Sequence, residues 1–164
     1  MQIRTQADYD ATPDEVFAIL SDPAFVHDTV IRMSVADHSS EVVERGATTI
    51  ITTVRSLPTD DFPEVAKRFV GEVLILREEQ QWGPRAADGG RVAELKLRID
   101  GAPVSVRGTL RLSPTRTGTA QDFQAQVTAR VPLVGGSIER AAAPAVIAGI
   151  EAEVGLIKEW LDAS

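Results

Sequence analysis

Residues 137–162 are SIERAAAPAVIAGIEAEVGLIKEWLD, the segment with the clearest periodic pattern in the chain. Its apolar residues recur every three or four positions, as expected for an amphipathic helix with about 3.6 residues per turn. The recurring positions are Ile138, Ala142, Val146, Ile150, Val154, Ile157 and Leu161. The spacing predicts one long C-terminal helix whose apolar stripe must be covered by another element.

Small residues make up the first half of this predicted helix. They include the alanines of residues 141–145, which surround Pro144, and then Ala148 and Gly149. Small side chains let a helix approach a sheet closely, which produces a filled core, or they leave volume that a ligand occupies. The pattern alone leaves both arrangements open.

The middle of the chain alternates between apolar and polar residues, as strands do when one face is buried. Leu95, Leu97 and Ile99 fall on one face, and charged residues lie between them. Asp100-Gly101 is a favourable hairpin turn between two such segments. Strands are predicted near residues 2–10, 34–44, 47–57, 72–82, 92–100, 104–113 and 119–131.

Two helix starts follow the first predicted strand. Residues 12–15, TPDE, combine a capping threonine, a proline at the first helical position and a glutamate that completes a capping box. Asp22-Pro23 repeats the signal, which predicts a second short helix to about Met33. Residues 58–70 are predicted to be a loop with a short amphipathic helix.

We therefore predict an α+β fold in one domain, residues 1–164. A curved antiparallel sheet of about seven strands is wrapped around the long C-terminal helix, with two short helices after strand 1.

Composition excludes several classes of function. The 164 residues carry a formal net charge of −7, which disfavours nucleic-acid binding because phosphate contacts need clustered Lys and Arg. The chain has no cysteine, and its two histidines, His27 and His38, match no familiar zinc spacing.

No apolar run approaches the roughly 18 residues that a membrane helix needs, and no signal-peptide core is present at the start. We expect a cytoplasmic protein with no metal, no cofactor and no stable membrane insertion. The patterns do not indicate an oligomeric state.

The order of these motifs resembles the START-like, or helix-grip, superfamily (SRPBCC). It includes polyketide cyclases, lipid-transfer domains and the birch-pollen-allergen group. The matching features are TPDEVF at residues 12–17, LSDP at 20–23, the strand meander and the long terminal helix. Trp82, residues 100–104 and residues 131–136 further resemble an uncharacterised actinobacterial branch. The resemblance favours a cavity between sheet and helix, and it supplies no catalytic residue that can be carried over.

We expect this cavity to bind a hydrophobic small molecule, such as a lipid or polyketide, without catalysis. The expected ligand-binding residues are Phe69, Trp82, Leu97, Ile99, Val106, Leu110, Phe123, Val127, Val146 and Ile150. Trp82 and the segment from Phe62 to Phe69 are expected near an entrance, with the short helix as a lid or a static cap. Apolar walls with few polar anchors suit binding by shape and burial.

Two alternatives remain. One is an enzyme of the cyclase or dehydratase type that uses a cavity carboxylate or Arg77 as its working group. The other is a packed interaction module without a ligand. The strand of residues 72–82 is apolar on both faces at its start, so its register is open. Either Arg77 and Glu79 or Glu78 and Gln80 face inward.

Overall fold

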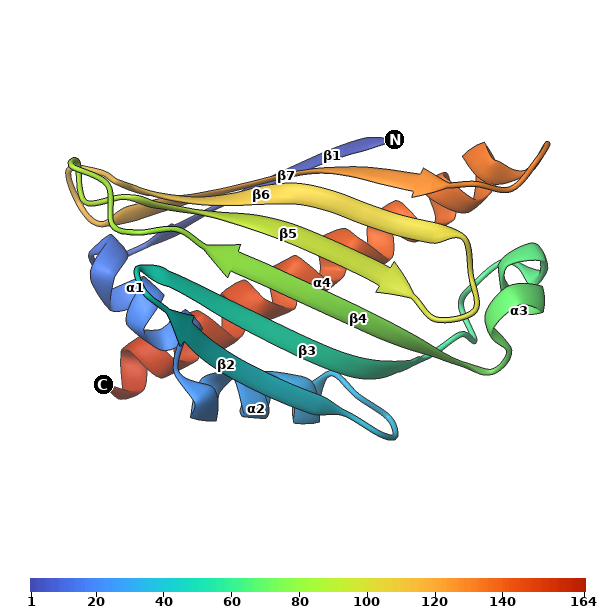
Figure 1. The fold of residues 1–164 in the computed structure, drawn as a ribbon, viewed down its shortest axis with the longest axis horizontal. Helices are drawn as coiled ribbons and strands as arrows, with labels where there is room; N and C mark the ends of the chain where they lie inside the picture. Colours follow the sequence, from blue (N-terminus) through green and yellow to red (C-terminus); the bar gives the residue numbers. More distant parts are fainter.

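The computed structural model describes residues 1–164, and it contains seven strands and four helices. In chain order they are β1 (Gln2–Tyr9), α1 (Pro13–Leu20), α2 (Pro23–Arg32), β2 (Ser39–Arg45), β3 (Thr48–Pro58), α3 (Glu64–Val70), β4 (Val73–Trp82), β5 (Arg91–Ile99), β6 (Val104–Pro114), β7 (Thr119–Ala129) and α4 (Gly135–Ala163). Figure 1 shows the sheet in front of α4, which crosses behind it.

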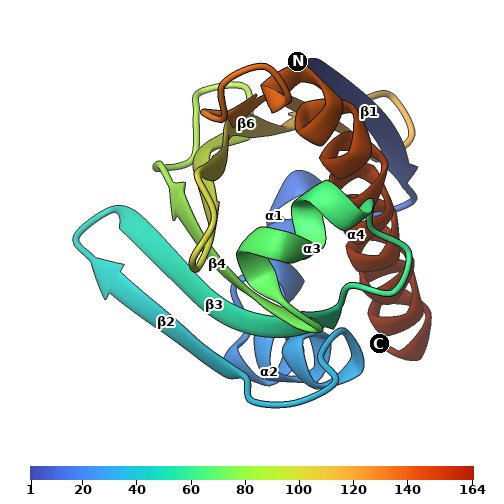
Figure 2. The same cartoon turned by 90° about the vertical axis from the view of Figure 1, so that its right-hand side faces the viewer.

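All seven strands form one antiparallel sheet in the order β1-β7-β6-β5-β4-β3-β2. The sheet is strongly curved, and seen from its end it bends toward α4, which lies along one side (Figure 2). The predicted fold class is confirmed. The bounds of the other six strands agree with the prediction to within about two residues, whereas β2 begins at Ser39 rather than near residue 34 and has no buried residue.

The long helix lies closest to one end of the strand order. Its main backbone neighbours are β7, β1 and α1, and its C-terminal half buries Leu156 and Ile157 in the core. The helix continues without interruption through Pro144, whose own position is exposed. The helix packs on the sheet near its start, through Ile138, and its part from Ala142 to Glu153 faces the middle of the sheet across a cavity.

Local sequence explains where α1 and α2 begin. The Thr12 hydroxyl accepts a hydrogen bond from the Glu15 backbone N–H, and the Glu15 carboxylate accepts one from the Thr12 N–H, at 3.2 and 2.7 Å. Asp22 caps α2 by accepting from the Ala24 N–H at 2.9 Å. These caps satisfy donors that a helix start leaves free. They define where α1 and α2 begin, and α1 lies at one end of the curved sheet (Figure 1).

The short helix α3 lies across the opposite end of the sheet (Figure 2). The segment that carries it is tied at its base, where the buried Thr59 hydroxyl donates to the Gly71 carbonyl at 2.6 Å. Gly71 has φ of 73°, a conformation that side chains disfavour, so glycine suits this turn. The curled sheet therefore has α1 at one end and α3 at the other.

Candidate functional site

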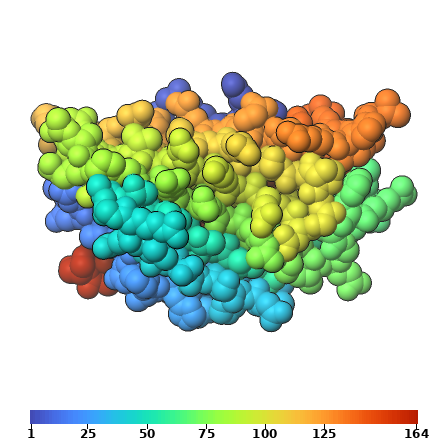
Figure 3. Space-filling model, viewed as in Figure 1, coloured from blue at the N-terminus to red at the C-terminus, as the bar shows by residue number.

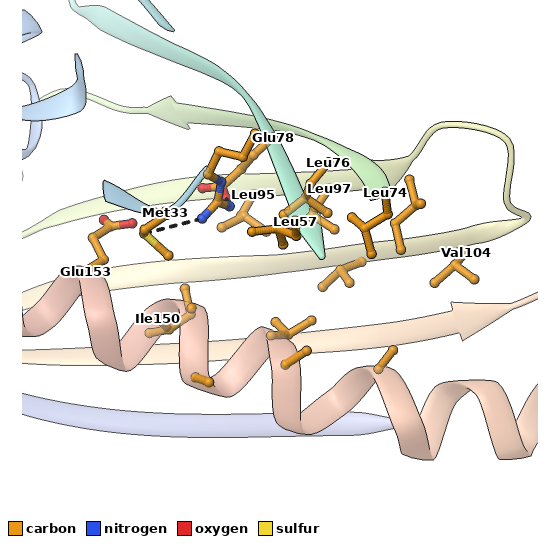
Figure 4. Close-up of a pocket in the computed structure, with 18 of the residues that line it drawn as sticks. Met33, Leu57, Leu74, Leu76, Glu78, Leu95, Leu97, Val104, Ile150 and Glu153 are labelled. Carbon is orange, nitrogen blue, oxygen red and sulfur yellow. Dashed lines mark hydrogen bonds and ion pairs between the residues drawn. The ribbon is translucent and has the colours of Figure 1, made fainter. Parts of the chain in front are cut away.

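A cavity of about 330 Å³ lies between the concave face of the sheet and α4. Of its 20 lining residues, 16 are hydrophobic. They come from β3 to β7, from α4, and from the segments before β2 and α3 (Figure 4). The full lining is Met33, Arg55, Leu57, Phe62, Leu74, Leu76, Glu78, Leu95, Leu97, Ile99, Val104, Val106, Phe123, Ala142, Ala145, Val146, Ala148, Gly149, Ile150 and Glu153.

The small residues of α4 are what keep this cavity open. Ala142, Ala145, Ala148 and Gly149 all line it, and a Cβ atom placed on Gly149 would meet only Met33, at 3.9 Å. Short side chains on the helix therefore face larger ones on the sheet without filling the space between them. On the other side, the sheet presents a continuous outer surface (Figure 3), which separates the cavity from solvent there.

Most of the residues expected from the sequence meet at this cavity. Leu97, Ile99, Val106, Phe123, Val146 and Ile150 all line it. Phe69 instead lines an adjoining pocket of about 40 Å³, which shares several of its walls, and is itself partly exposed. Leu110 and Val127 are buried in the core away from the cavity wall.

Trp82 occupies a different place from the one expected. It is completely buried at the α1 end of the sheet, where its ring packs edge-on against Phe17 with centroids 5.5 Å apart. The cavity lies along the other half of β4, at Leu74, Leu76 and Glu78. Trp82 therefore does not lie near an entrance, because α1 covers the end of β4 that carries it.

The structure settles the register of β4. Glu78 and Gln80 are buried on the concave side, whereas Glu79 is exposed. Arg77 points outward and forms a half-exposed ion pair with Asp100, with Nε and Oδ1 2.9 Å apart. Hydrogen bonding to Arg77 holds the pKa of Asp100 below its ordinary value. The hypothesis that Arg77 is a working group of the cavity is wrong.

One end of the cavity is polar, and its central contact is a buried ion pair. Arg55 on β3 and Glu78 on β4 are diagonal neighbours on the concave face, and Nη2 lies 2.6 Å from Oε2. Both side chains are only 8% exposed. The second Glu78 oxygen accepts from the Gln80 amide at 2.7 Å, and the Gln80 carbonyl accepts from the Trp82 indole N–H at 3.0 Å. This network links the cavity to the packed end of the sheet.

Glu153 reaches the same polar end from α4 (Figure 4). The Glu153 side chain is half-buried and makes no hydrogen bond to another protein group. Burial raises the pKa of Glu153 to about 7; the negative charge of Glu78 acts in the same direction and Arg55 opposes it. Burial also raises the pKa of Tyr9 on β1, and the charge of Glu153 adds to this. The cavity therefore contains a carboxyl group that exchanges its proton near neutral pH.

The sequence analysis did not identify Arg55 or Glu153 as cavity residues. Strand alternation places Arg55 on a buried face, and helical spacing does the same for Glu153. Arg55 is in phase with Ile51 and Leu57, which face inward on β3. Glu153 lies three residues after Ile150, on the apolar stripe of α4. A charged residue on a buried face was the available sign of a polar site.

The two histidines lie outside the cavity. His27 and His38 are exposed, with ring centroids 6.0 Å apart. No group of three or more His, Cys, Asp or Glu side chains is arranged to hold a metal ion.

Comparison with known proteins identifies the family of this chain. Residues 4–161 match the family described as "Protein of unknown function (DUF2505)". The chain belongs to the DUF2505 family. An uncharacterised protein of Mycobacterium bovis is 29% identical over 92 residues, which are 55% of this DUF2505 chain and 52% of the relative. The match thus spans about half the length of the curated relatives, and it agrees with the predicted actinobacterial resemblance.

Solved structures confirm the START-like fold of this DUF2505 protein. A STAR-related lipid transfer protein from Xanthomonas axonopodis has a TM-score of 0.63 at 14% identity, over 98% of this chain and 85% of that chain. The Zhui aromatase/cyclase from Streptomyces sp. R1128 has a TM-score of 0.56 at 14% identity, over 95% and 87%. Identities this low establish a shared fold and leave function to the site. None of the helices combines the length and the apolar character needed to cross a membrane.

Proposed function

We propose that this DUF2505 protein binds a hydrophobic small molecule in the cavity between its sheet and α4. The observation that carries the proposal is the cavity of about 330 Å³ with 16 hydrophobic residues among the 20 that line it. Small-molecule sites commonly have volumes from about 300 Å³ upward, with mostly apolar walls and few polar groups. The fold shared with a lipid transfer protein supports the same proposal.

Physical considerations favour an occupied cavity. Apolar walls that face an empty space lose dispersion contacts, and filling the space restores them. Each Å² of apolar surface removed from water adds about 25 cal/mol. Gly149 in the helix interior costs about 1 kcal/mol relative to alanine, and it lies where a larger residue would take up cavity volume. The third reading of the sequence, a packed interaction module, required a filled core and is disfavoured by the cavity.

Filling the cavity from the helix tests the proposal. Gly149→Leu places a side chain in the cavity, whereas the matched control Gly155→Leu changes a glycine of the same helix that has no atoms near its Cβ position. Binding of an apolar fluorescent dye should weaken by about tenfold or more in Gly149→Leu and stay unchanged in Gly155→Leu. Equal dye binding by both variants and the unaltered protein would contradict the proposal.

A second candidate function, acid–base catalysis, is favoured by Glu153. A carboxyl group with a pKa of about 7 inside an apolar cavity is suited to proton transfer at neutral pH. The shared fold with an aromatase/cyclase is compatible with this role. The two functions separate in one assay, in which a poly-β-ketone is incubated with the protein and recovered. A binder returns it unchanged, whereas an enzyme converts it at a rate that falls in Glu153→Gln.

A further inference from the structure

The strand β2 leaves one edge of the sheet unpaired. It is the last strand in the sheet order and pairs only with β3. Its pairing with β3 runs without a bulge from Ser39 to Arg45, and it contains no proline. Bulges, prolines and very short strands commonly protect an edge from further pairing. Because β2 has none of these, the backbone groups on its outer side are free to pair with another strand.

Charged side chains can also protect an edge, and β2 has three of them. Glu41, Glu44 and Arg45 are all exposed. None of the three makes an ion pair within the chain. Val42 packs against the core, so Glu41, Val43 and Arg45 point to the outer, convex face of the sheet. The outer face of the edge therefore presents an acid, an apolar residue and a base in that order.

A second copy of β2 complements this order when it runs antiparallel. In one continuous sheet with a two-fold axis through Val43, Glu41 of each copy faces Arg45 of the other copy, and Val43 faces itself. An axis through Glu41 or through Glu44 brings that glutamate opposite itself, and an axis through Val42 forms no ion pair. Opposite charges across neighbouring strands stabilise the pairing, and like charges destabilise it. The charges of β2 thus favour one register of self-pairing.

We propose that two copies of this chain form a dimer through their β2 edges, paired antiparallel about Val43. The main-chain hydrogen bonds of a strand added to a sheet edge provide affinity, and the side chains select the partner and the register. The partner is a second copy because the charge order of β2 complements itself. This inference is independent of the proposed binding function.

The outer face next to β2 supports the same register. Val43 lies directly opposite Ile50 of β3, and both side chains are half-buried. In the dimer, Ile50 and Val43 of one copy continue into Val43 and Ile50 of the other, which forms an apolar row across the two-fold axis. The two pairs of Glu41 and Arg45 lie on either side of this row. Burial of the apolar row favours association, and the flanking charges fix its alignment.

The surroundings of β2 leave room for a second strand. Figure 2 shows the β2–β3 hairpin extending beyond the rest of the molecule, with α2 beside its base. The C-terminal end of β2, where the proposed pairing is centred, lies away from that helix. None of the residues that line the cavity belongs to β2. Dimer formation through β2 therefore leaves the cavity unchanged.

Sedimentation equilibrium of the full-length protein, from about 1 µM to about 1 mM, tests the proposal. The average mass should rise with concentration from that of the monomer, 17.6 kDa, toward twice that value. Glu41→Arg and Arg45→Glu each place like charges opposite one another at both flanking pairs, and each should raise the dissociation constant about tenfold or more. The control Glu94→Arg changes an exposed residue on the outer face of β5 and should leave the constant unchanged.

Mixing the two edge variants tests the register. In a mixed dimer of Glu41→Arg with Arg45→Glu, every charged side chain of the two pairs meets the opposite charge, so the mixture should associate about as tightly as the unaltered protein. Binding of an apolar dye should be the same for all variants, which shows that their fold and cavity are intact. A protein that stays monomeric throughout, a dimer that neither substitution weakens, or a mixture that does not associate would each overturn the proposal. All three outcomes leave the proposed function intact.

Discussion

The two ends of the concave sheet face contain similar apolar residues, yet one end is solid and the other is hollow. At the packed end, Trp82 and Leu112 of the sheet are completely buried beneath α1, and so is Val16 of that helix. At the cavity end, Leu74 and Leu97 face the small residues of α4 across about 330 Å³. The strands supply comparable side chains to both ends. The difference therefore comes from the covering helices, and the sizes of helix residues determine where this fold has room for a ligand.

Matched truncations of leucine at the two ends should give the largest difference. Leu112→Ala at the packed end removes contacts on every side and should lower the free energy of unfolding by about 4 kcal/mol. Leu97→Ala should lower it by about 2 kcal/mol, because one side of Leu97 already faces open space. Urea unfolding of both variants measures the difference. Equal losses would indicate that the cavity end is as tightly packed as the α1 end.

The carboxyl group at the cavity end should make stability depend on pH. The pKa of Glu153 is about 7 in the folded protein and near 4.5 when unfolded, so between these values the folded state holds a proton that the unfolded state has lost. The free energy of unfolding should therefore fall as pH rises from 4.5 to 7 and level off above.

Removing this group tests the effect. Above pH 7, Glu153→Gln should be more stable than the unaltered protein by up to about 3 kcal/mol, and its advantage should vanish near pH 4. The control Glu151→Gln, on the exposed side of α4, should show no such trend. A Glu153→Gln variant that is equally stable at all pH values would show that Glu153 is well hydrated in the folded protein.

The outer face of the sheet should show the smallest effect. Arg77→Ala removes the half-exposed pair with Asp100 and should leave the unfolding midpoint and dye binding unchanged, because solvent screens such pairs. Arg55→Ala, on the concave face of β3, should instead destabilise the protein strongly, because it leaves Glu78 buried without its partner. A loss of dye binding in Arg77→Ala would contradict this prediction, because it would show that the outer face of the sheet takes part in binding.

The sequence predicted the architecture well because its signals are local. The periodicity of residues 137–162, the capping residues Thr12 and Asp22, and the Asp100-Gly101 turn each act within a few residues. Strand alternation correctly predicted Leu97, Ile99, Val106 and Phe123 as part of the cavity wall. Trp82 was misplaced because alternation identifies the concave face but does not tell which end of it α1 covers.

The polar end required information that the sequence does not contain locally. Arg55, Glu78 and Glu153 come from three elements, and only the pairing of β3 with β4 and the position of α4 bring them together. The register of β4 was open because Leu74, Ile75 and Leu76 fit either face. The tertiary structure resolves it through the pairing of Glu78 with Arg55.

Titration of isotope-labelled protein with decane, followed by NMR of the leucine, valine and isoleucine methyl groups, tests the central claim most directly. Binding between α4 and the sheet predicts saturable shifts at Leu74, Leu97 and Ile150, with the signals of Val16 and Leu112 unmoved. Absence of any shift, or shifts confined to the α1 end, would contradict the account.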